Sequence, residues 1–372
     1  KLRMKQVWYE WKKLISDKSV LLVVVLSMCI VLGYQWKNAD SYAWQRNESY
    51  REYYEDALTT VEKMDAETAR QWLQEESAWQ SFLLSAAYGD SDMAFELLQM
   101  NAPEVDWNKR LKENANEKTD IQQTQQKYQA FTKLLERVNY AISYAEFLES
   151  VKTQAQSMSK LSLFSDVDSF SEKNIQKTAE AYEKMNAVQP GLTYSDAADA
   201  WSDSALADVI VPGLLLFLGW AIFRKEKEAG LYQLLGSTKR GHLEMALAKT
   251  IVYFFFAVLL AILLYGSQIV LAILMYGTGD MTLALISIPS FRNCPYPISI
   301  QQYLILYLGV KVLAALFYAS VIMAMLTRRW RFGIAASACV VVICLEYLAY
   351  DQINSVSTVS YTHLTLPTKL EV

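Results

Sequence analysis

The sequence predicts an all-α polytopic membrane protein, and two observations lead to this fold class. The first is a set of five apolar runs, each approaching or exceeding the roughly 20 residues that a transmembrane helix needs. The second is a long polar region, residues 37–204, which separates the first run from the second and has strong helical periodicity. We therefore expect five transmembrane helices, with a large helical extracytoplasmic domain between the first and the second.

The overall composition is an average over two unlike parts of the chain. Of the 372 residues, 53% are apolar and 20% are charged, and the charged residues lie mainly in the polar region and in short segments beside the apolar runs. The net charge of −4 combines an acidic polar region with basic flanks around the apolar runs. Because the basic residues form no global patch, nucleic acid is not an expected partner.

Cysteine and histidine usage excludes two kinds of site. The polar region contains no cysteine, so no disulfide framework is expected there. His242 and His363 are the only histidines, too few for a histidine-based metal site. We therefore expect no metal and no cofactor on this chain. The cysteines lie in apolar runs or in a short loop, outside any CxxC motif, at Cys29, Cys294, Cys339 and Cys344.

Residues 1–36 are expected to form an interfacial helix and the first transmembrane helix. Residues 4–15 bring apolar side chains to one helical face with lysines beside it: Val7, Trp8, Trp11, Leu14 and Ile15. This pattern is typical of a helix in the membrane interface, although a basic flank before a span would look similar. Residues 19–34 follow as an apolar run. A cleaved signal peptide is the alternative, but no clear small-residue cleavage site follows the run.

The polar region 37–204 is expected to fold as a bundle of four to six helices. Residues 40–63 and 127–158 keep apolar side chains at three- and four-residue spacing. Acidic and serine residues in capping positions precede two further predicted helices, at residues 93–100 and 170–185. We interpret the aromatic residues of these stripes as core rather than as a ligand site.

The remaining apolar runs predict four more spans, in a domain assigned to residues 205–350, with the first run beginning slightly earlier. They lie at residues 201–223, 246–276, 300–326 and 332–350, with an outer loop at 277–299. Basic residues cluster before the first span and in the two predicted inner loops, and they are sparse in the outer loop. This bias places the N-terminus inside and residues 37–204 outside, in the cytoplasmic membrane of a bacterium.

The last residues of the chain differ from everything before them. Residues 351–372 are polar and β-prone, and they resemble translated adapter read-through. We expect them to be a non-native tail, and the natural protein to continue with a sixth span.

The sequence contains no motif that predicts catalysis. It has neither a G-x-x-x-x-G-K-[ST] phosphate loop nor a G-x-G-x-x-G motif, and no Ser/His/Asp set can be assembled. Neighbouring carboxylates in the polar region fit solvated helix faces and caps better than acid–base chemistry. A membrane enzyme would need several convergent polar residues within its spans. The chain is therefore not expected to be an enzyme.

Two charged residues fall inside the predicted spans. Lys311 lies in the outer half of the fourth span, and Glu346 lies near the outer end of the fifth. Isolated charges are costly there, so each needs a partner or must reach the headgroups. One reading is a Lys311–Glu346 pair that lines a substrate path; the other, slightly favoured, is snorkelling to the interface. Asp203 and Asp208 are interpreted as marking the outer end of the second span.

The short charged segment at residues 224–249 joins the second and third spans. It combines acidic and basic residues with glycines and short apolar stretches. This segment resembles the coupling segment of the ABC-2 family of ABC-transporter permeases, and the likeness extends to the order of interfacial helix, first span, outer domain and clustered spans. The residues that carry the expected coupling role are Glu226, Glu228, Gly230, Leu234, Gly236 and Arg240. Plain positive-inside anchoring is the other interpretation of these charges.

The resemblance implies a function and a set of partners. It implies the permease subunit of an ABC transporter, an exporter with six spans that works as a homo- or heterodimer. In that family the segment docks on a separate ATP-binding subunit, so ATP and Mg would belong to the partner chain. The alternative from a different class is a membrane-anchored stalk or receptor whose helical outer domain binds a partner. A pure anchor needs only one or two spans, which favours transport.

Overall fold

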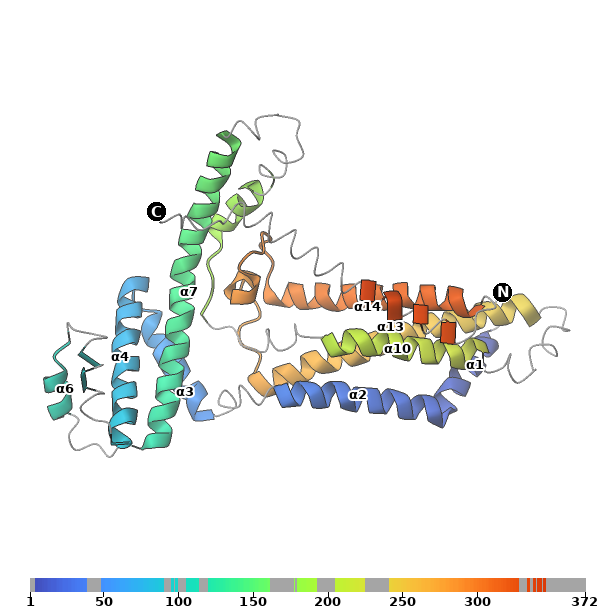
Figure 1. The fold of residues 1–372 in the computed structure, drawn as a ribbon, viewed down its shortest axis with the longest axis horizontal. Coiled ribbons are helices and arrows are strands. Elements are labelled where there is room, and N and C mark those ends of the chain that lie inside the picture. The colour runs from blue at the N-terminus through green and yellow to red at the C-terminus, as the bar shows by residue number, and fades with distance from the viewer. Residues whose placement is uncertain are drawn as a thin grey trace. The chain divides into compact units, whose positions relative to one another are not determined.

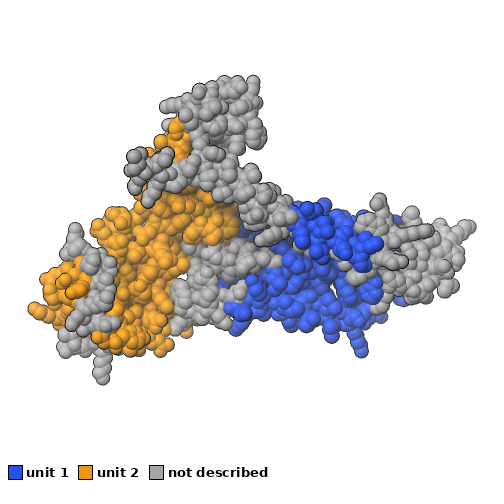
Figure 2. Space-filling view, viewed as in Figure 1, with its two compact units in different colours: residues 1–39, 196–277, 301–372 blue, residues 40–195, 278–300 orange. Residues whose placement is uncertain are grey.

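The computed structural model describes most of the chain, and most of the described residues are helical. No β-strand occurs among the described residues, which confirms the predicted all-α class. The described residues are 4–38, 48–89, 95–96, 98–99, 105–113, 120–160, 177, 179–192, 205–224, 241–327, 333–334, 337–338, 340–342 and 344–345. They divide into two compact units (Figure 2), one of residues 1–39, 196–277 and 301–372 and one of residues 40–195 and 278–300.

The first unit contains four helices that are long and apolar enough to cross a membrane. They are α2 (Lys18–Asn38), α10 (Ala205–Gly219) with its π-helical continuation η4 (Trp220–Arg224), α13 (Gly241–Tyr276) and α14 (Ile300–Thr327), seen side by side in Figure 1. These four helices fall on the first four predicted spans and, by their length and composition, are compatible with a multi-pass membrane protein. The fifth predicted span, residues 332–350, lies largely outside the described residues.

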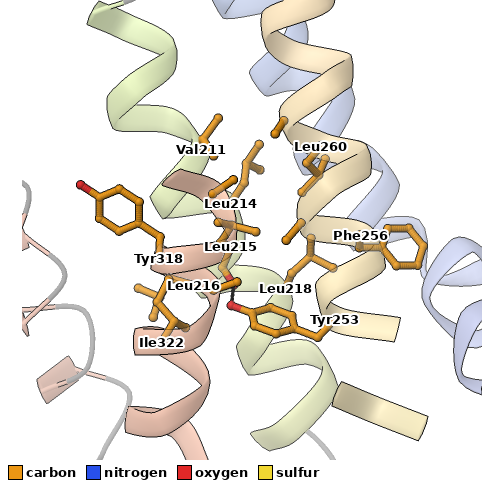
Figure 3. Packing of buried hydrophobic residues seen from close by; sticks show 14 of the residues in the cluster. Val211, Leu214, Leu215, Leu216, Leu218, Tyr253, Phe256, Leu260, Tyr318 and Ile322 are labelled. Atoms are coloured by element: carbon orange, nitrogen blue, oxygen red, sulfur yellow. Dashed lines mark hydrogen bonds between the residues drawn. The ribbon is translucent and has the colours of Figure 1, made fainter. Parts of the chain in front are cut away.

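The core of this span bundle contains residues of α10, α13 and α14, together with residues of α2 and of the amino-terminal helix. Leu215 and Leu218 of α10 are almost fully buried against Tyr253 of α13 and Ile322 of α14 (Figure 3). The Tyr253 hydroxyl donates to the main-chain carbonyl of Leu215 at 3.0 Å, so α13 holds α10 by a polar bond inside an apolar core. Lipid tails are as apolar as leucine, and close packing and such interhelical bonds therefore decide which helices associate.

The amino-terminal helix α1 (Met4–Ser16) is confirmed as a helix, but its apolar residues do not share one environment. Leu14 is 5% exposed and belongs to the core of the span bundle, and Val7 packs against that core. Trp8 and Ile15 remain 59% and 45% exposed. The seven apolar and aromatic residues of α1 are spaced at 100° per residue, and together they cover a sector of the helix too wide to pack on one neighbour. One edge of this sector therefore faces α13, and the other edge stays exposed.

The second unit is a helical bundle with its own core. Its helices are α3 (Glu48–Val61), α4 (Ala66–Ala87), α6 (Trp107–Glu113) and α7 (Ile121–Lys160). α3 and α4 both pack on α7. The shared core contains Leu73 of α4, which no predicted stripe included, and buried apolar residues from the predicted stripes: Tyr50, Tyr54, Leu58, Leu134 and Val138. The aromatic positions Tyr50 and Tyr54 are therefore core residues, as predicted.

Helix boundaries in this unit follow ordinary capping chemistry. Asp65 precedes α4, and its carboxylate accepts a hydrogen bond from the Thr68 amide at 3.2 Å. Bonds from the Thr68 side chain and amide lower the pKa of Asp65, because they favour its charged form. The predicted helix 93–100 is described only at four positions, all helical, and 170–185 is described only from residue 177 onward; both sets of predicted caps lie outside the described residues.

The connection between α13 and α14 is an integral part of the second unit. Within residues 278–300, the turn η5 (Leu285–Ser287) packs against α7, and the turn η6 (Pro289–Phe291) follows it. The Tyr140 hydroxyl donates to the Ile286 carbonyl at 2.6 Å, and Arg292 Nη2 donates to the Ser143 carbonyl at 3.1 Å. A loop predicted only to link two spans is therefore a structural element of the helical bundle.

Two tyrosines at this junction differ in how their hydroxyls are satisfied. Burial raises the pKa of Tyr140 and of Tyr144 to about 12, so both are protonated at neutral pH. Tyr140 donates to Ile286, whereas the buried Tyr144 hydroxyl has no hydrogen-bond partner among the described residues. The two residues therefore form a matched pair for mutation.

We expect Tyr140→Phe to destabilise the protein by about 1–2 kcal/mol, because it leaves the Ile286 carbonyl without its donor. Tyr144→Phe should be neutral or stabilising, because it removes a buried hydroxyl that lacks a partner. Equilibrium unfolding of the full chain in detergent measures both changes. Equal losses in the two variants would contradict the assignment of the hydrogen bond.

Candidate functional site

A charged pair lies within the helices of the span bundle. Lys311 of α14 places its ammonium 2.6 Å and 2.8 Å from the two carboxylate oxygens of Asp208, near the start of α10. The side chains are 20% and 43% exposed, respectively. Two opposite charges at this distance form a pair with no net charge, which lowers the cost of placing either one in an apolar surrounding.

Aromatic side chains complete the surroundings of this pair. The Tyr265 hydroxyl of α13 donates to Asp208 Oδ1 at 2.7 Å. The Lys311 ammonium lies 5.1 Å from the centre of the Tyr265 ring and 5.4 Å from that of Tyr307, within the range of cation–π attraction. The two rings meet edge to face at 6.4 Å. We call Asp208, Tyr265, Tyr307 and Lys311 the charge cluster.

The local sequence explains why these side chains meet. Tyr307 and Lys311 are four residues apart on α14 and therefore share one face of the helix. Pro212 lies inside α10 and has no amide hydrogen, so it cannot give the Asp208 carbonyl the usual intrahelical bond. The backbone of α10 is thus less constrained at Asp208 than elsewhere along the helix.

A second polar contact ties α2 to α13. Gln35 Nε2 donates to the Gln268 main-chain carbonyl at 2.9 Å, and both glutamines are more than nine-tenths buried. Gln268 lies three residues after Tyr265 and therefore on the same side of α13. α13 is thus held by polar bonds to α2 and to α10 over one short stretch.

The chemistry that the charge cluster can perform is binding rather than bond making. It contains one carboxylate and one ammonium that already neutralise each other, and the tyrosine hydroxyl donates to the carboxylate. An approaching charged or hydrogen-bonding group could exchange for either partner. No group of three or more His, Cys, Asp or Glu side chains able to hold a metal ion occurs among the described residues.

The structure brings only one of the sequence-predicted site residues into this cluster. Lys311 is there, and its partner is Asp208 of α10. Glu346, the partner considered from the sequence, lies outside the described residues. The expected coupling residues also lie outside them, because residues 225–240 are not described: Glu226, Glu228, Gly230, Leu234, Gly236 and Arg240.

Sequence reasoning missed Asp208 and Tyr265 as site residues. Asp208 was visible as an acidic residue four positions before a proline in an apolar run, but it was interpreted as a boundary marker. Tyr265 has no distinguishing pattern in an aromatic-rich helix.

Comparisons with protein-family models, with curated proteins and with solved structures find no match to this chain.

Proposed function

We propose that this chain is the permease subunit of an ABC transporter of the ABC-2 type, acting as an exporter with ATP hydrolysis on a separate subunit. The observation that carries the proposal is the charge cluster, where α10, α13 and α14 each place a polar group at one point of an apolar bundle. Ionisable residues inside membrane segments are costly and commonly mark functional sites, substrate and ion pathways among them. The ABC-2 type is proposed because residues 224–249 resemble the coupling segment of that family.

The orientation follows from the distribution of basic residues. Lys and Arg residues precede α2 and lie in the segment that joins α10 to α13, so both belong on the cytoplasmic side. Residues 37–204 then lie outside the cell. The chain would sit in the cytoplasmic membrane as one of two permease copies.

The position of α10 suggests how ATP hydrolysis reaches the charge cluster. α10 and η4 form one helical stretch from Ala205 to Arg224, about 30 Å at 1.5 Å per residue. Asp208 lies near one end of this stretch, and the proposed coupling segment begins at the other. A displacement of the segment would therefore move Asp208 relative to Lys311 and Tyr265. Opening that pair would expose charges to a substrate between the two permease copies.

The test is co-purification with an ATP-binding-cassette subunit encoded beside this chain. We expect the wild-type pair to purify together and to hydrolyse ATP. Glu228→Lys reverses a charge on the docking surface, and Gly230→Pro breaks the predicted coupling helix. Each should reduce permease-dependent ATPase activity at least about tenfold, which is the effect of losing roughly 1.4 kcal/mol of coupling, while membrane insertion is retained.

Glu55→Lys is the matched control, because it makes the same charge change at an exposed position of α3. It should leave both association and ATPase activity unchanged. Normal association and normal activity in Glu228→Lys and Gly230→Pro would contradict the docking assignment.

A membrane-anchored stalk or receptor is the second candidate function. It is favoured by the second unit, which has a helical core of its own and could bind a partner independently. Failure of the wild-type chain to associate with any neighbouring ATP-binding subunit would favour this reading.

A further inference from the structure

A buried lysine joins three helical elements, α1, α13 and η4, the π-helical continuation of α10. Lys249 of α13 is 8% exposed, and its ammonium donates to the Ile222 main-chain carbonyl in η4 at 3.0 Å. Glu10 of α1 is 7% exposed and places a carboxylate oxygen 4.0 Å from the same ammonium. The charged side chain of one helix thus contacts the backbone of a second and the carboxylate of a third.

The chemistry of this contact explains why a lysine occupies the position. η4 is a π-helical turn, a rare conformation that shifts backbone hydrogen bonds and often marks functional sites. Carbonyls at the carboxyl end of a helix carry partial negative charge, which a cation stabilises. Lys249 therefore acts as a cap supplied by another helix. Glu10 compensates the ammonium charge, which would otherwise be costly to bury.

The two residues of this contact also lie on either side, in the sequence, of the charged segment between α10 and α13. Ile222 lies just before residues 225–240, and Lys249 lies about two helical turns after α13 begins at Gly241. The Lys249–Ile222 bond therefore clamps together the two helices from which this segment leaves and to which it returns. Through Glu10, α1 is held against the same clamp, with Leu14 buried one turn further along.

We propose that Lys249 is a positioning residue that makes α1, the end of α10 and the base of α13 move as one body when residues 225–240 are displaced. Without this clamp, a load on the segment would unwind η4 locally instead of shifting α10 as a whole. The clamp itself is independent of what the segment binds. Its role in energy coupling rests on the proposed function.

Hydrogen exchange in the full chain tests the clamp directly. Lys249→Met keeps the side-chain length and removes the charge. We expect exchange to accelerate about tenfold or more at the amides of residues 220–224, as follows from losing a hydrogen bond to a charged group. Exchange across α1 should accelerate several-fold, because Glu10 loses the opposite charge 4.0 Å away. Lys12→Met, on the exposed side of α1, is the control and should change neither region. Unchanged exchange in Lys249→Met would overturn the clamp.

Glu10→Gln removes the charge that faces Lys249 and leaves the Lys249–Ile222 hydrogen bond in place. It provides a second test if the Lys249→Met variant fails to insert into the membrane. It should accelerate exchange in α1 several-fold and leave residues 220–224 protected, because the Lys249–Ile222 bond remains. Acceleration confined to η4, or none in α1, would overturn the assignment of Glu10.

Coupling is measured separately, with the ATP-binding subunit present. Lys249→Met should still associate with that subunit but lose about tenfold of its permease-dependent ATPase activity, equivalent to losing roughly 1.4 kcal/mol of coupling. Full activity together with accelerated exchange would overturn the positioning role. If the wild-type chain fails to bind the subunit, the proposed function falls, and the exchange measurements still decide whether the clamp exists.

Discussion

Replacing Lys311 by methionine should destabilise the span bundle by about 2–3 kcal/mol, because the substitution leaves the Asp208 carboxylate without its ammonium partner. Breaking a fully buried ion pair costs roughly 3–5 kcal/mol. The value expected here is lower because the Asp208 side chain is 43% exposed. Tyr265 would still donate to the carboxylate, but a neutral hydroxyl compensates only part of the charge. Equilibrium unfolding in detergent measures the loss.

The double variant Asp208→Asn with Lys311→Met makes this prediction specific. Removing both charges leaves no uncompensated ion, so the double variant should recover most of the stability lost by Lys311→Met alone. Ser320→Ala on the exposed side of the same helix is the control for general effects on α14. A double variant that is as unstable as the sum of its single variants would show that the two charges are independent.

The same pair of variants addresses transport. If the charge cluster lines a substrate path, the double variant should be stable and yet defective in export. If the cluster only holds α10 and α14 together, the double variant should be stable and active. Stability and activity therefore need to be measured on the same preparation.

Replacing Gly219 by leucine should destabilise the bundle by about 1–3 kcal/mol through overpacking. Gly219 is the last residue of α10 before η4, and it lies against side chains of α13 and α14. A Cβ atom there would fall 2.7 Å from Leu326 Cδ1 and 3.3 Å from both Ile322 Cγ2 and the Tyr253 hydroxyl. Leu326 can rotate away, but Tyr253 is held by its bond to Leu215. Alanine should therefore be tolerated better than leucine.

Gly213→Leu is the matched control for this prediction. Gly213 lies on the same helix, and a Cβ atom there would meet nothing within 4 Å. The control makes the same chemical change without the steric conflict, so its unfolding free energy should remain near that of the wild type. Leucine has the higher helix propensity of the two residues, so equal destabilisation in both variants would show that the close contacts at Gly219 are not the cause.

The sequence by itself determined the helical class and the four long apolar helices of the first unit, because these depend on local properties. Residues that cross a membrane must be apolar over about 20 positions, and this requirement can be read without knowing what a helix touches. The apolar stripe of α3 likewise identified Tyr50 and Tyr54 as core, since spacing along one helix defines which residues share a face.

Only the tertiary structure decided which faces meet. Asp208 and Lys311 are separated by 103 positions in the sequence, and their contact depends on how α10 and α14 are rotated about their axes. The division of α1 into an inward edge at Leu14 and an outward edge at Trp8 has the same origin. Periodicity specifies which residues share a face of one helix. The helix that covers that face is decided by packing among several helices, and each residue contributes only a small part of that packing energy. The charge cluster and the Lys249 contact are products of that packing.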